Sequence, residues 1–77
     1  MTLVIAYFKD PFHPEASLMK EFLRWQGIMY DMMHDPKLVM KSSGGKGTPC
    51  VIDPSGVVAV GFFALVDWLR KEGRVLI

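Results

Sequence analysis

Residues 47–61 read GTPCVIDPSGVVAVG, and this stretch determines the expected fold. Two short apolar runs, 50–52 and 57–60, flank the turn sequence Asp-Pro-Ser-Gly. Proline presets φ for such a turn and glycine tolerates positive φ, so the two runs predict a β-hairpin. Pro49 has no N–H to donate inside a central strand, and we expect it just before the first hairpin strand. A proline held there is a candidate for a cis peptide bond.

Composition indicates a single domain over residues 1–77 without disulfides. Hydrophobic residues make up 51% of the chain, and nine basic and eight acidic residues give a net charge of +1. These charges are interleaved, which argues against a nucleic-acid-binding face. Cys50 is the single cysteine, so an internal disulfide is excluded. No apolar run approaches the length of about 18–20 residues that spans a membrane, and no signal-peptide pattern is present; we therefore expect a cytoplasmic protein.

Hydrophobic patterning predicts the other elements. Residues 2–8 form a continuous apolar run, typical of a strand buried on both faces. Helical periodicity follows over 15–26, with His13 as the expected N-cap, Pro14 as the first helical residue and Gly27 as the stop. The remaining expected elements are a strand over 28–33, a short helix from Pro36 through 41, a flexible loop over 42–47, the hairpin, and an amphipathic helix over 62–72.

The apolar stripes of the two long helices predict which side chains face the core. In the first helix the expected stripe is Leu18, Met19, Phe22 and Leu23, extended by Trp25 or Gln26. In the last helix it is Phe62, Leu65, Val66 and Leu69. The order β-α-β-α-β-β-α requires a parallel first pair of strands and adds an antiparallel hairpin. The sequence therefore predicts an α/β domain with a four-stranded mixed sheet and helices on both faces.

This element order, with Thr-Pro before the third strand, resembles that of the glutaredoxins, which have the thioredoxin-like fold. Gly27-Ile28 matches the end of the family's first helix, Thr48-Pro49 its cis-proline loop, and Gly61-Phe62 the start of its last helix. The resemblance covers nearly the whole chain. It implies a ligand groove, which binds glutathione in the family, between the start of the first helix, the Thr48-Pro49 loop and the start of the last helix. The residues that would line this groove are Phe12, His13, Pro14, Thr48, Pro49, Gly61, Phe62 and Phe63.

The residues that carry glutaredoxin chemistry are replaced. Counted back from Gly27, the family's redox motif falls on residues 13–16, which read His-Pro-Glu-Ala and contain neither cysteine. The Asp pair that receives the glutathione carboxylate is replaced by Phe63 and Ala64. Thiol–disulfide exchange needs a thiolate at the helix N-terminus, which imidazole and methyl groups do not supply. A dithiol oxidoreductase is therefore excluded, no cofactor is expected, and glutathione stays open as a ligand.

Two residues remain as catalytic candidates, each with a second interpretation. Cys50 is either a lone thiol nucleophile beside the proline loop or a small buried hydrophobe that opens a strand. His13 is either a general base or anion-binding group at a helix N-terminus, or an ordinary surface residue. His34 has no ligand partner at a recognised spacing, so no metal site is expected.

Two functions are consistent with these observations. The first is a non-redox binding or interaction domain, in which an apolar patch of Phe12, Phe63 and the Pro49 loop replaces the charged groove. Its partner would be another protein, a second copy of the chain or an apolar ligand. The alternative is a monothiol glutaredoxin-type or glutathione-linked enzyme that uses Cys50.

Overall fold

The computed structural model describes residues 3–8 and 14–75. Within these ranges no helix is both long and apolar enough to cross a membrane. In chain order the elements are β1 (Leu3–Ala6), α1 (Glu15–Trp25), β2 (Tyr30–Met33), α2 (Pro36–Ser43), β3 (Cys50–Asp53), β4 (Gly56–Val60) and α3 (Phe62–Lys71).

The four strands form one sheet in the order β2-β1-β3-β4. β1 pairs with β2 in parallel, and α1 connects the two strands because a parallel pair needs a crossover. β1 and β3 are antiparallel, as are the hairpin strands β3 and β4. The predicted α/β architecture with a four-stranded mixed sheet is confirmed, and β1 is a central strand as its continuous apolar sequence indicated.

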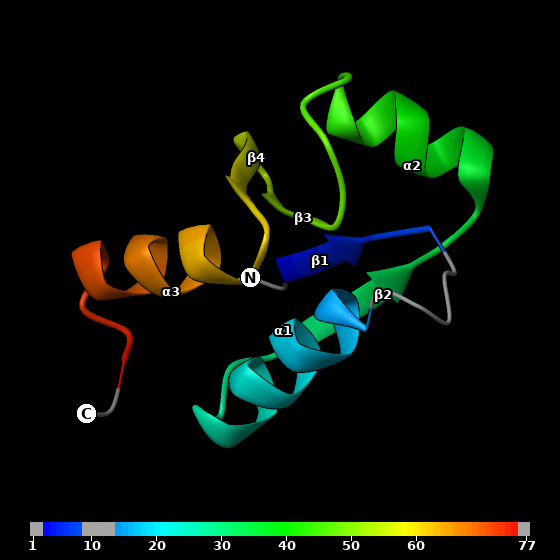
Figure 1. Cartoon of the computed structure of the whole chain (residues 1–77). Coiled ribbons are helices and arrows are strands. Elements are labelled where there is room, and N and C mark those ends of the chain that lie inside the picture. The colour runs from blue at the N-terminus through cyan, green and yellow to red at the C-terminus, as the bar shows by residue number, and fades with distance from the viewer. Residues whose placement is uncertain (1–2, 9–13, 76–77) are drawn as a thin grey trace.

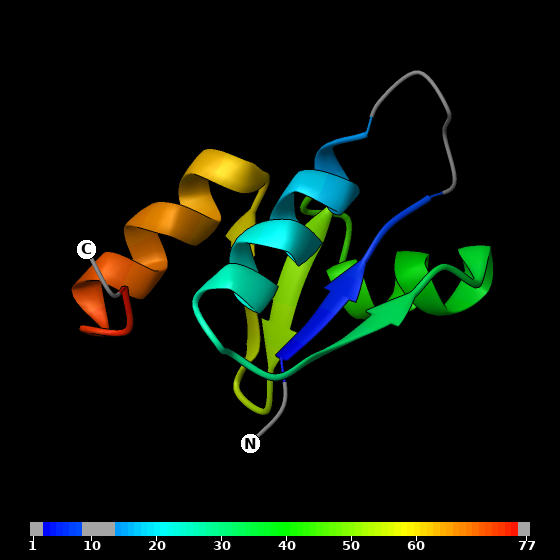
Figure 2. The same cartoon turned by 90° about the horizontal axis from the view of Figure 1, so that it is seen from below.

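The helices cover both faces of the sheet. α1 and α3 lie side by side on one face, and α2 lies on the other (Figure 1, Figure 2). Successive strand residues point to opposite faces, so Leu3 and Ile5 pack toward α1 and α3 while Ala6 packs toward α2.

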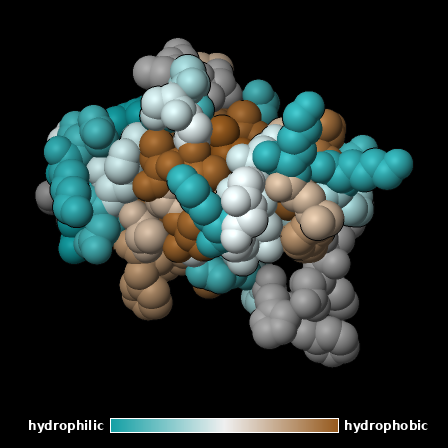
Figure 3. All heavy atoms as spheres, turned by 90° about the horizontal axis from the view of Figure 1, so that it is seen from above, coloured by the Kyte–Doolittle hydropathy of each residue, from teal (hydrophilic) through white to brown (hydrophobic). Residues whose placement is uncertain are grey.

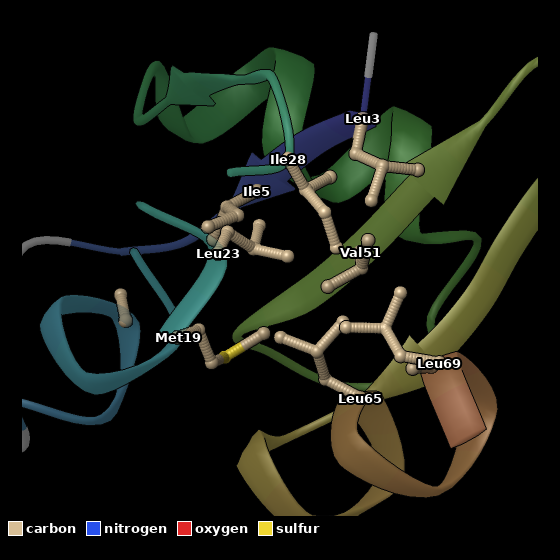
Figure 4. Packing of buried hydrophobic residues seen from close by; sticks show 10 residues of the cluster. Leu3, Ile5, Met19, Leu23, Ile28, Val51, Leu65 and Leu69 are labelled. Atoms are coloured by element: carbon tan, nitrogen blue, oxygen red, sulfur yellow. The ribbon is translucent and has the colours of Figure 1, made fainter. Parts of the chain in front are cut away.

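The larger core lies between the sheet and the helix pair α1 and α3. Side chains from β1, β3, α1 and α3 meet there (Figure 4). The members labelled in the figure are Leu3, Ile5, Met19, Leu23, Ile28, Val51, Leu65 and Leu69. Each large apolar side chain that is fully buried stabilises the fold by roughly 1.5–3 kcal/mol. This shared core fixes α1 and α3 relative to each other.

Local signals explain the hairpin. The Asp53 carboxylate accepts hydrogen bonds from the backbone N–H of Ser55 at 2.7 Å and from its hydroxyl, which closes the predicted turn. The pairing then shifts register, because Val51 pairs with Ala59 while Ile52 pairs with Val57. β4 therefore carries an extra residue at position 58, and the bulge strengthens the local twist of the strand.

Three sequence predictions need correction. Pro14 is the N-cap of α1 with ψ of 23° and is not the first helical residue. Helix α2 continues through Ser43, so the predicted loop at 42–47 starts too early; the Ser43 hydroxyl donates to the Met40 carbonyl and is buried. In α1 the core side chains are Ala16, Met19 and Leu23, and Gln26 is buried at the C-cap, whereas Leu18 and Trp25 are exposed.

Helix α2 begins with a side-chain cap that can be tested. The Asp35 carboxylate accepts from the backbone N–H of Lys37 at 3.0 Å. We expect Asp35→Ala to lower the free energy of unfolding by about 1 kcal/mol in urea denaturation, because that N–H loses its acceptor. Asp35→Asn keeps the acceptor and should stay within about 0.5 kcal/mol of the parent. An equal loss in both variants would contradict the capping interpretation.

Candidate functional site

Three segments predicted to line the groove meet at one edge of the fold. The backbone N–H of Gly61 donates to the Pro49 carbonyl at 2.8 Å, which joins the proline loop to the start of α3. The backbone N–H of Phe62 donates to Glu15 Oε2, also at 2.8 Å, which joins α3 to the start of α1. The Thr48–Pro49 bond is cis, as predicted.

Glu15 joins the start of α1 to the start of α3, a role that its position in the sequence does not indicate. It is the first residue of α1, and its carboxylate lies at the N-terminus of α3, 47 residues away in sequence. The N-termini of both helices carry partial positive charge, which favours a carboxylate between them. An acidic residue in the first turn of α1 is a recognisable signal, but nothing local in the sequence identifies its partner. The first amide of α3 is therefore satisfied by the chain's own carboxylate.

The same contact requires a glycine at position 61. Its φ of 88° and ψ of 170° fall in a region that is essentially restricted to glycine. A Cβ at this position would lie 2.9 Å from Glu15 Oε2. Glycine is therefore required here both for the backbone conformation and for the approach of the carboxylate.

The candidate thiol, Cys50, lies inside the protein. Its exposed fraction is 0%, and it packs with Ala6 and Val39 between the sheet and α2. Burial raises the pKa of the Cys50 thiol. A reactive cysteine needs both access and a lowered pKa, and Cys50 has neither in this structure.

The other residues predicted to line the groove differ in their exposure, and two of them lie outside the described part of the chain. Phe12 and His13 lie outside the described residues, and Pro14 is exposed. Phe62 is half-buried, and its ring lies 5.8 Å from that of Phe63, which is 83% exposed. The Phe62 ring also makes an edge contact with Phe22 of α1, at 5.7 Å between centroids.

A groove continues from Phe62 along the outer side of α1. Its volume is about 550 Å³. The lining residues are Leu18, Glu21, Phe22, Arg24, Trp25 and Phe62, and we call this surface, together with Phe63, the α1–α3 groove. Leu18, Phe22 and Trp25 follow the spacing i, i+4, i+7, so they form a second apolar stripe on α1, about a third of a turn around the helix from its core stripe. Leu18 is 55% exposed and Trp25 is 77% exposed.

A second hollow lies on the α2 side of the sheet. Its volume is about 360 Å³, and its lining residues are Phe8, Met40, Ser43, Gly45, Gly47 and Thr48. Thr48 therefore lines this hollow, whereas its neighbour Pro49 is bonded to the start of α3. Seen from above Figure 1, hydrophobic residues gather near the middle of the molecule, with hydrophilic residues at its two sides (Figure 3).

The titratable residues do not gather into a metal-binding set. In the part of the chain that the structure describes, no three His, Cys, Asp or Glu side chains are grouped as metal ligands. His34 is exposed, and its ring lies 5.8 Å from that of Tyr7.

No family model matches this chain, and no curated protein or solved structure is detectably similar to it.

Proposed function

We propose that this protein is a non-redox binding domain on a thioredoxin-like scaffold of the glutaredoxin type, and that it engages a protein partner through the α1–α3 groove. The observation that carries the proposal is the complete burial of Cys50, the single thiol of the chain. Thiol chemistry at Cys50 would require β1, β3 and α2 to separate, because Ala6, Val39 and the strand pairing enclose it.

The scaffold assignment is supported by topology. The strand order β2-β1-β3-β4, with a parallel first pair and an antiparallel hairpin, is compatible with the glutaredoxin arrangement. The cis Thr48–Pro49 bond before β3 and the helices on both faces agree with it as well.

The Glu15 contact argues against glutathione as the ligand. In the family that the sequence resembles, the glutathione carboxylate is received at the start of the last helix. Here the first amide of α3 already donates to Glu15. A second carboxylate would have to displace Glu15 and would meet its negative charge at close range.

The exposed side chains of the α1–α3 groove have the composition that is typical of a protein-binding surface. Aromatic residues are enriched at the energetically important positions of interfaces, and Trp25 and Phe63 are both mostly exposed. Glu21 and Arg24 add opposite charges beside them, with 3.7 Å between the Arg24 Nη1 and Glu21 Oε1 atoms. A contiguous apolar patch with charged neighbours is typical of a docking surface.

Titration with reduced glutathione, followed by amide NMR, tests the proposal. We expect no saturable shifts at millimolar glutathione, because the Phe62 amide is already bonded to Glu15. In the Glu15→Ala variant the Phe62 amide resonance should shift in the absence of ligand, because the amide loses its acceptor. This shift would show that the Phe62 resonance reports on the state of that hydrogen bond. Saturable shifts at both Thr48 and Phe62 in the parent protein would instead support a glutathione-linked function.

A further inference from the structure

We draw no further inference here: the strongest candidate, the apolar α1–α3 groove beside Phe62, belongs to the site already described, and nothing in the structure shows what covers it.

Discussion

Cys50 should react with iodoacetamide at least about 1000-fold more slowly in the native protein than in the urea-unfolded chain. The thiol has no exposed surface and is enclosed by Ala6, Val39 and its neighbours in the sheet. Reaction therefore requires an opening that separates β3 from β1 or α2. Central strands open with free energies close to that of global unfolding, which is about 5 kcal/mol or more for a stable domain.

The dependence of this rate on pH gives a second readout. Burial raises the pKa of the Cys50 thiol, so the native thiol stays protonated at pH values where the unfolded thiol, with a pKa near about 8.5, ionises. Ser17→Cys in a Cys50→Ala background is the control, because Ser17 is exposed on α1 and its replacement should react at similar rates in both states. A native Cys50 rate within about tenfold of the unfolded rate, with a midpoint well below about 8.5, would contradict burial and favour the monothiol enzyme.

The parts of the fold with local causes could be predicted from the sequence. The hairpin follows from turn residues that bond within the turn, as Asp53 does to Ser55. The end of α1 follows from Gly27, which has φ of 72° beyond the C-cap. The central position of β1 follows from a run without polar residues.

The inward face of α1 could not be decided from the sequence. Ala16, Met19 and Leu23 have the spacing of an apolar helical stripe, and so do Leu18, Phe22 and Trp25. Residue size favours the second set as the core, yet the close packing of α1 on the sheet accommodates Ala16 and leaves Trp25 outside. The tertiary structure decides between the two stripes, and the one it leaves outside forms the α1–α3 groove.

The candidate site depended on contacts between distant segments. The Thr48–Pro49 loop and the start of α3 were expected near one another through the resemblance to glutaredoxins, and Pro49 and Gly61 do share a hydrogen bond. Within its own helix Glu15 is only an acidic residue in the first turn, where a negative charge is favourable. Its bond to Phe62 spans 47 residues, and no periodicity or turn signal encodes a contact of that range.

Gly61→Ala should lower the free energy of unfolding by about 3 kcal/mol. Alanine is strained at φ of 88° and ψ of 170°, and its Cβ would lie 2.9 Å from Glu15 Oε2. The carboxylate would have to move, so the Phe62 amide would lose its acceptor in a partly buried position. Urea denaturation measures the loss. Gly27→Ala is the control for positive φ alone, because a Cβ at Gly27 meets no atom within 4 Å, and it should cost about 1 kcal/mol.

A double-mutant cycle separates the two causes of the Gly61→Ala effect. In a Glu15→Ala background the new Cβ meets no carboxylate, so Gly61→Ala should cost at least about 1 kcal/mol less than in the parent. An unchanged cost would mean that backbone strain accounts for the whole effect and that Glu15 does not couple α1 to α3.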